Sequence, residues 1–270
     1  MATFPPMNRN DIAEAIARIV ALDRRNATPV EVHAALASAF HGFIVAAPTW
    51  DPGLKVFRAR KCADPMSVAD LGYPPADRSG LQRASLPGKP VFYCSTSREV
   101  ALWEVHPRPG EIIAVGEWAT SAPLLVNHVG YSASVFQRLG SVRESVAWND
   151  MPVPVAHDPS VREFGDYLSD LFSEPVSLDD EYKFIVTAAI AEKLLGEPFG
   201  GLMYPSVRMQ ANGDNIAIAA RFADANLALQ MCHKIHVDQV DEASMDFHVI
   251  DTAEVVGNSL VWTGVPHAWV

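Results

Sequence analysis

One acidic residue stands inside an apolar helix, where a carboxylate is costly unless it has a partner. The stretch VFYCSTSREVALWEV (residues 91–105) begins as a short buried strand and continues as a helix that is apolar on almost every side, and Glu104 lies within that helix. We expect Thr96 to cap this helix, with Glu99 as its capping-box partner. Buried carboxylates are usually paired or hydrogen-bonded. Glu104 therefore either reaches solvent or an arginine at the helix end, or it is a carboxylate directed into a cleft that receives a cation.

Two arginines are candidates for the positive charge of such a cleft. Arg58 lies in an expected half-buried strand at residues 54–60, and Arg83 lies in the Pro/Gly-rich segment 61–90. A guanidinium group matches phosphate oxygens in a bidentate manner, although each arginine taken alone is also compatible with a solvated surface. A connection as long as residues 61–90 is usually functional or disordered. Tyr93 stands in the strand beside it, as a core aromatic or as a wall of the site.

A second unusual stretch is GLMYPSVRMQANGDNIA, at residues 201–217. The proline after Tyr204 ends an expected strand, which leaves Ser206 at the mouth of the strand rather than in the ladder. Asn215 is expected to cap a short helix at residues 215–222. Ser206 is compatible with a turn or capping serine as well as with a ligand-binding serine.

Common nucleotide, hydrolase and zinc motifs are missing from the sequence. It has no GxGxxG after a strand, no GxxxxGK[ST] and no GxSxG. The segment MCHKIH offers Cys232, His233 and His236, but no second ligand pair follows at zinc spacing. If residues 227–238 form a strand, the two histidines face opposite sides, so we expect no metal site from these residues.

The elements that must position the candidate residues indicate an α+β chain, because strands come in runs that separate helices interrupt. We expect an N-terminal helical extension at residues 1–45 and a second domain at residues 46–270, which contains all the candidate residues. The extension holds two amphipathic helices, and Thr28 with Glu31 forms a capping box for the second. Its apolar stripes are expected to pack on the same chain, with a homodimer or another partner as alternatives.

Charge and composition restrict the class of partner. The formal net charge of -11 argues against nucleic acid as the main partner. The apolar runs are too short to cross a bilayer, and the N-terminus has no pattern of a signal peptide, so no membrane role is expected. Three widely spaced cysteines predict no disulfide framework and fit a reducing cytoplasm. The excess of arginine over lysine, with many alanines, is typical of a bacterium with a GC-rich genome.

The order of these motifs resembles the RES domain family, named for its Arg, Glu and Ser. The motifs are Phe57-Arg58, Gln82-Arg83, PGKPVFYCS at residues 87–95, Glu104, the YPS at residues 204–206 and Asn215. The resemblance covers roughly residues 54–263. It departs from the family where the loop arginine usually stands in GRxN, since this chain has Gln82, Ala84 and Ser85 around Arg83.

The resemblance implies a fold, an activity and partners. RES proteins are similar to ADP-ribosyltransferases, with mixed or antiparallel central sheets flanked by helices. Several are bacterial toxins that destroy NAD by phosphorolysis or hydrolysis at the nicotinamide bond, and many are neutralised by an antitoxin. The implied substrates are NAD and, for a phosphorylase, inorganic phosphate, with no cofactor. Transfer of ADP-ribose to a protein and a catalytically silent binding module remain the alternatives.

The resemblance also implies a role for each candidate residue. Glu104 would bond a hydroxyl of the nicotinamide ribose and stabilise the positive charge that develops on that sugar. Arg58 and Arg83 would hold the pyrophosphate, and Tyr93 would pack on the nicotinamide ring or the ribose. Ser206 would bond the nicotinamide ribose or the carboxamide. Tyr204 and Asn215 are further expected substrate-binding residues, and Asn215 would support the turn that carries Ser206.

Overall fold

Long strands with alternating burial make up most of the fold. The computed structural model describes residues 8–41, 43, 47–144, 159–241 and 244–267. The strands are β1 (Thr49–Trp50), β2 (Lys55–Arg60), β3 (Val91–Ser95), β4 (Ile112–Thr120), β5 (Leu124–His128), β6 (Gly201–Pro205), β7 (Asp214–Ala219), β8 (Leu227–Val240), β9 (Met245–Val256) and β10 (Ser259–Trp262). They form one sheet in the order β1-β5-β6-β7-β3-β2-β4-β8-β9-β10. Only the β5–β6 pair is parallel among the described strands, so the sheet is mixed, as expected.

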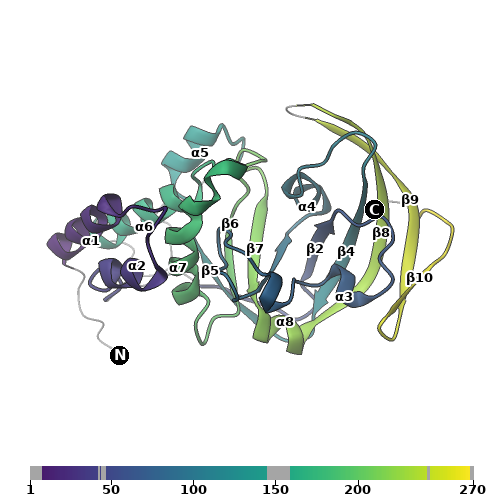
Figure 1. Ribbon diagram of the computed structural model, residues 1–270, viewed down its shortest axis with the longest axis horizontal. Coiled ribbons are helices and arrows are strands. Elements are labelled where there is room, and N and C mark those ends of the chain that lie inside the picture. The colour runs from purple at the N-terminus through teal and green to yellow at the C-terminus, as the bar shows by residue number, and fades with distance from the viewer. Residues whose placement is uncertain (1–7, 42, 44–46, 145–158, 242–243, 268–270) are drawn as a thin grey trace.

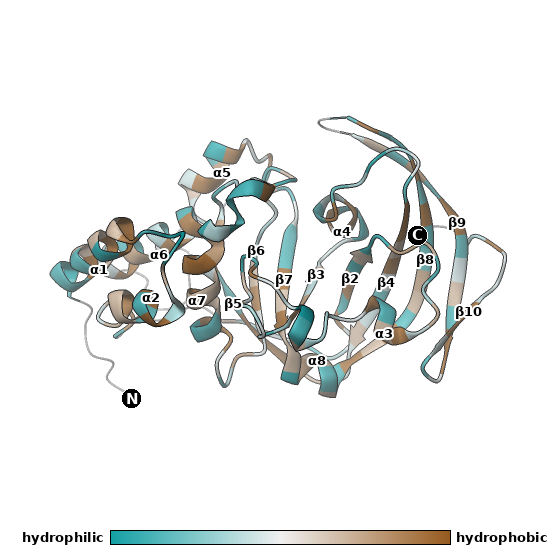
Figure 2. Cartoon of the chain, viewed as in Figure 1, coloured by the Kyte–Doolittle hydropathy of each residue, from teal (hydrophilic) through white to brown (hydrophobic). Residues whose placement is uncertain are grey.

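The helices gather mainly at one end of this sheet, on the left in Figure 1. They are α1 (Arg9–Ala21), α2 (Pro29–Leu36), α3 (Val68–Leu71), α4 (Arg98–Glu104), α5 (Ala133–Leu139), α6 (Pro159–Phe172), α7 (Phe184–Leu194) and α8 (Ala220–Asn226), with 3-10 turns η1 (Ala76–Arg78) and η4 (Leu178–Lys183). Figure 2 shows apolar residues along α7 and β4, which lie inside the molecule, whereas α1 presents polar residues outward. A mixed helix and sheet fold is thus confirmed.

The two N-terminal helices belong to the same apolar core as the helices that follow. The predicted capping box of α2 is present, because Thr28 and Glu31 bond each other's backbone N–H. Ile12 and Ile19 of α1 are completely buried with Phe164 and Phe172 of α6. The apolar stripes therefore pack on this chain. The expected division near residue 45 falls outside the described residues.

Both faces of the middle strands are buried, and successive residues of each strand point to opposite faces. Val91 of β3 joins the core beneath the helices, whereas its neighbour Phe92 joins a second core on the other face. Tyr204 and Met203 of β6 divide in the same way. The helical side of β3, β6 and β7 is therefore one continuous surface on which a site can be built.

Two local predictions were wrong. Residues 215–222 form the end of a strand, β7, and the start of α8, so Asn215 is a strand residue and not a helix cap. Its neighbours in the sequence are apolar because both faces of this central strand are buried. A short apolar run of this kind is also typical of a buried helix. Helix α4 is capped by Ser97, whose hydroxyl accepts from Val100 N, and not by Thr96, whose hydroxyl donates to Asp214 O.

None of the helices in the described ranges is both long and apolar enough to cross a membrane.

Candidate active site

A cleft opens where β2 and β3 separate. In the described chain the two strands share one registered pair, Phe57 with Ser95. Beyond this pair, the Arg58 guanidinium lies between the two strands, and its Nη1 donates a hydrogen bond to the Tyr93 carbonyl over 2.6 Å. The cleft has a volume of about 760 Å³ and is lined by both strands, by the end of α4 and by the loop before β3. This volume lies within the range of small-molecule sites, about 300–1,000 Å³.

Glu104 is the last residue of α4, and its carboxylate lines the cleft. Ser206 donates its hydroxyl to Glu104 Oε1 over 2.6 Å, and Asn215 donates Nδ2 to the same oxygen over 2.6 Å. No described residue donates a hydrogen bond to Oε2. The carboxylate is thus fixed through one oxygen, while the other remains available to a ligand.

Strand register orients the amide that holds Glu104. Ser95 and Asn215 are directly opposite each other on β3 and β7, and the Ser95 hydroxyl donates to Asn215 Oδ1 over 2.8 Å. This bond leaves the amide nitrogen of Asn215 facing Glu104. Tyr204 lies opposite Asn215 on its other side, in β6. Three adjacent strands therefore place polar groups on one face under the carboxylate.

A tight turn after β6 presents Ser206. The Ser206 N–H donates to Gly213 O over 2.8 Å, and the Ser206 carbonyl accepts from Ala211 N over 2.8 Å. Its hydroxyl also accepts from Met209 N over 3.2 Å. Both backbone groups of Ser206 are hydrogen-bonded, so the residue can be completely buried. Its hydroxyl is directed at Glu104. The strand ends at the proline before Ser206, as the sequence predicts.

Arg58 is a buried cation with unused donor capacity. Burial, and secondly the nearby Arg60, lower the pKa of Arg58 to about 10. The group stays charged at neutral pH. Its Nε has no hydrogen-bond partner among the described residues. A buried charge with a free donor beside a cleft is suited to an anionic ligand.

The guanidinium of Arg83 is already hydrogen-bonded within the protein. It stands at the tip of a two-residue turn between Gln82 and Ser85, whose backbones bond each other. Its guanidinium donates to the carbonyls of Phe172 over 2.8 Å and Glu174 over 3.0 Å, at the end of α6. Arg83 still lines the cleft. It therefore ties the loop to α6 as well as contributing charge.

The two tyrosines are walls of the cleft that also anchor its loop. The Tyr93 hydroxyl accepts from Ala84 N over 2.8 Å and donates to Ser85 Oγ over 3.3 Å, which fixes the loop that carries Arg83. Burial raises the pKa of Tyr93 to about 12, and that of Tyr204 well above its usual value, so both are neutral. Tyr204 packs against Phe172 with ring centroids 6.0 Å apart.

A basic rim around Glu104 was not predicted from the sequence. Arg208 donates from Nη2 to His106 Nδ1 over 2.7 Å, and Lys61 donates to the His106 carbonyl over 2.7 Å. Burial, and secondly Arg208, lower the pKa of His106. Closeness in the sequence could have indicated this rim. His106 follows Glu104 by two positions, and Arg208 follows Ser206 by two positions.

The charge of the cleft is opposite to that of the chain. Among the residues that the structure describes, six basic ones line it against two acidic ones, in a chain of net charge -11. The basic residues are Arg58, Arg60, Lys61, Arg78, Arg83 and Arg208, and the acidic ones are Glu104 and Glu181. Such a local concentration of positive charge favours a small ligand with phosphate groups.

The structure thus brings together Arg58, Arg83, Tyr93, Glu104, Tyr204, Ser206 and Asn215, all predicted from the sequence. A family model described as RES domain matches residues 55–239. The chain belongs to the RES domain family. No curated protein matches the chain.

The RES domain match contains every predicted site residue and begins with β2. It leaves α1 and α2 outside, as well as β9 and β10. The departure from GRxN also has a structural counterpart. Ser85 donates its hydroxyl to Gly80 O over 3.3 Å and accepts from Tyr93, so it supports the loop from within.

Proposed function

We propose that this RES protein degrades NAD by cleaving the bond between nicotinamide and ribose, as a phosphorylase or a glycohydrolase. One observation carries the proposal: Glu104 is fixed through Oε1 by Ser206 and Asn215, with Oε2 available, in a basic cleft. The family and the order of its motifs support NAD as the ligand. An ADP-ribosyltransferase-like fold is part of the same proposal.

Cleavage of the bond between nicotinamide and ribose does not require a general acid. The nicotinamide of NAD is a cation that departs neutral, and the ribose that remains develops positive charge at the carbon that loses it. A carboxylate beside this carbon stabilises that charge most in a site that excludes water. Glu104 takes this role, and its rigid support means that little reorganisation is needed as the charge develops.

The remaining residues hold the dinucleotide. Arg58, which lines the cleft, and the basic rim bind the pyrophosphate oxygens. Tyr93 and Tyr204 form neutral aromatic walls for the ribose or the nicotinamide ring. Ser206 donates to Glu104 and holds its carboxylate in place. The acceptor that attacks the ribose is phosphate or water.

Incubation of the purified full chain with NAD, with and without inorganic phosphate, tests the proposal. Separation of the products by chromatography should show nicotinamide. Free ADP-ribose identifies a glycohydrolase, and phosphorylated ADP-ribose formed only with phosphate identifies a phosphorylase. Transfer of label only to an added protein would instead identify an ADP-ribosyltransferase. Binding of NAD without any product would overturn the catalytic proposal and leave a binding module.

Loss of NAD would make the protein a toxin to its own cell, and a toxin requires a neutralising antitoxin or immunity partner. Expression in a bacterial host should stop growth and lower cellular NAD. The Glu104→Gln variant, expressed to the same level, should do neither. If both proteins stopped growth equally, toxicity would not come from this site.

A further inference from the structure

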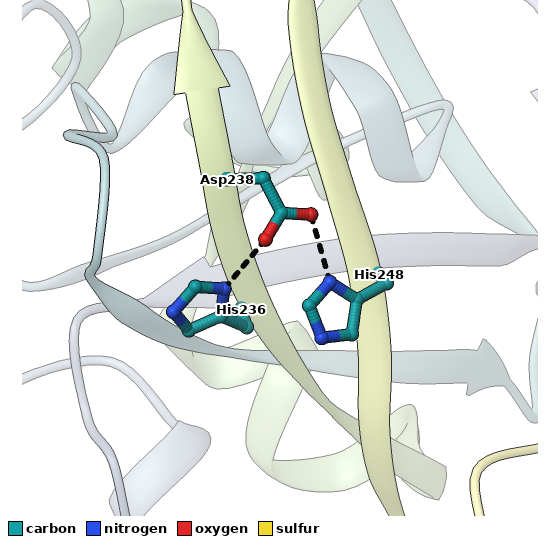
Figure 3. Close-up of side chains that lie close together, drawn as sticks. All are labelled: His236, Asp238 and His248. Carbon is teal, nitrogen blue, oxygen red and sulfur yellow. Dashed lines mark hydrogen bonds and ion pairs between the residues drawn. The ribbon is translucent and has the colours of Figure 1, made fainter.

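A second cluster of chemically active side chains lies on the β8–β9 pair, away from the cleft. His236 of β8 and His248 of β9 are directly opposite each other in the antiparallel register. Asp238 follows His236 by two residues, and all three side chains point to a common centre (Figure 3). None of the three lines the cleft around Glu104.

The carboxylate of Asp238 joins the two imidazoles. Nδ1 of His236 lies 2.8 Å from Oδ1, and Nδ1 of His248 lies 2.7 Å from Oδ2. The imidazole rings are 5.2 Å apart between centroids. One ligand atom from each residue lies within 4.8 Å of the others. The side chains of His236, Asp238 and His248 are 35%, 42% and 57% exposed, so the centre is open to solvent.

A β-bulge aims Asp238 at this centre. The β8–β9 register shifts between Val237 and Gln239, which leaves Asp238 without an opposite residue on β9. Bulges re-aim a side chain and recur at functional positions of a sheet. His233, by contrast, is buried and bonded to Thr252, so it does not share the exposed centre.

We propose that His236, Asp238 and His248 bind one divalent first-row transition-metal ion, with Zn²⁺ as the representative ion. Two imidazole nitrogens and one carboxylate oxygen are a donor set that such ions prefer over Mg²⁺ or Ca²⁺. Metal–ligand bonds of about 2.0–2.2 Å place the donor atoms roughly 3.4 Å apart in a tetrahedron. The two nitrogen–oxygen contacts, which are 2.8 and 2.7 Å long, must each lengthen by roughly 0.6–0.7 Å to admit the ion.

Binding exchanges two hydrogen bonds for three coordinate bonds. Each neutral imidazole changes tautomer through solvent, so that the proton leaves Nδ1 and a proton is gained at Nε2. Nδ1 then gives its lone pair to the ion, and water completes the coordination shell. The ion then joins β8 to β9 across the outer part of the sheet. Because the site forms only when the strands pair, the ion stabilises the folded chain.

Titration of tag-free, chelator-treated full chain with ZnCl₂ in a calorimeter tests this site. We expect one ion per chain and a melting temperature that rises by several degrees in saturating Zn²⁺. Titration with CoCl₂ should give visible absorption bands typical of nitrogen and oxygen ligands in low coordination number. Absence of Zn²⁺ binding by the wild-type chain would overturn the proposal.

Two histidine variants and a matched control assign the ligands. His236→Gln and His248→Gln should each weaken Zn²⁺ binding by about 10-fold or more, since even an outer partner of a ligand is worth that much. The exposed His41 lies in another part of the chain, and His41→Gln should bind Zn²⁺ as the wild type does. Equal binding by all three variants would place the ion elsewhere and reject the site.

The Asp238→Asn variant tests the proposed metal site if a histidine variant does not fold. The amide keeps the size of the side chain and still accepts one imidazole hydrogen bond, so the hairpin should remain intact by circular dichroism. The expected result is a loss of at least about 10-fold in Zn²⁺ affinity. An Asp238→Asn protein that is folded and binds Zn²⁺ normally would contradict the proposal.

Discussion

Asn215 donates its amide to the carboxylate of Glu104 over 2.6 Å, although 111 residues separate them along the chain. The contact joins the end of α4 to the central strand β7. It converts an acid in an apolar helix, which looks unfavourable in the sequence, into a supported group.

Glu104→Gln should fold normally and lose turnover. The Gln Oε1 atom can still accept from Ser206 and Asn215, while its amide replaces Oε2 and removes the negative charge. Nicotinamide release should fall by about 100-fold or more, the effect of losing one group that stabilises a transition state. Glu99→Gln, an exposed change on the same helix, is the matched control and should keep its activity. Full activity of Glu104→Gln would remove the carboxylate from the mechanism.

Ser95 should act only through Asn215, as a positioning residue. Its hydroxyl fixes the amide of Asn215, and Ser95→Ala should lower kcat by about 10-fold with little change in KM. In an Asn215→Ala background the same substitution should have almost no further effect, because the group that it orients is gone. Steady-state kinetics of the two single variants and the double variant measure this. Fully additive losses would show that Ser95 acts independently.

Arg58 and Arg83 should respond differently to truncation. Arg58→Ala should weaken NAD binding by about 10-fold or more, because it removes a charged donor from the cleft. Arg83→Ala should weaken binding and also lower stability, by about 1–3 kcal/mol for each of the two backbone carbonyls that lose their donor. NAD titration and chemical denaturation separate the two effects. The exposed Arg18→Ala serves as the control for both.

Unchanged stability of Arg83→Ala would mean that water satisfies the two carbonyls at the end of α6. Unchanged affinity would mean that the residue serves the loop alone. In that case the departure from GRxN would have removed it from the binding of NAD.

Much of the site was predictable because its residues lie at fixed places in local elements. Alternation predicted β2 with Arg58, the proline after Tyr204 predicted the end of the strand before Ser206, and the apolar helix made Glu104 conspicuous. Local patterns do not contain strand register. The partnership of Ser95 with Asn215, and of His236 with His248, therefore appears only when distant strands are paired.

Long-range packing explains the remaining differences. Residues 216–219 are all apolar because both faces of β7 are covered, and such a short run does not distinguish a strand from a helix. The anchoring of Arg83 depends on α6, about 90 residues further along the chain. No pattern near Arg83 indicates this contact.

The last prediction concerns the helical end of the molecule. Ile19 of α1 is completely buried in the core that includes Phe172 of α6, whose carbonyl also holds Arg83. Ile19→Ala should cost about 2–5 kcal/mol and lower the melting temperature by several degrees, because it leaves a cavity. Its neighbour Val20 is 69% exposed, so Val20→Ala is the matched control and should change stability little. Equal melting temperatures for the two variants would show that the N-terminal helices add no stability to the RES domain.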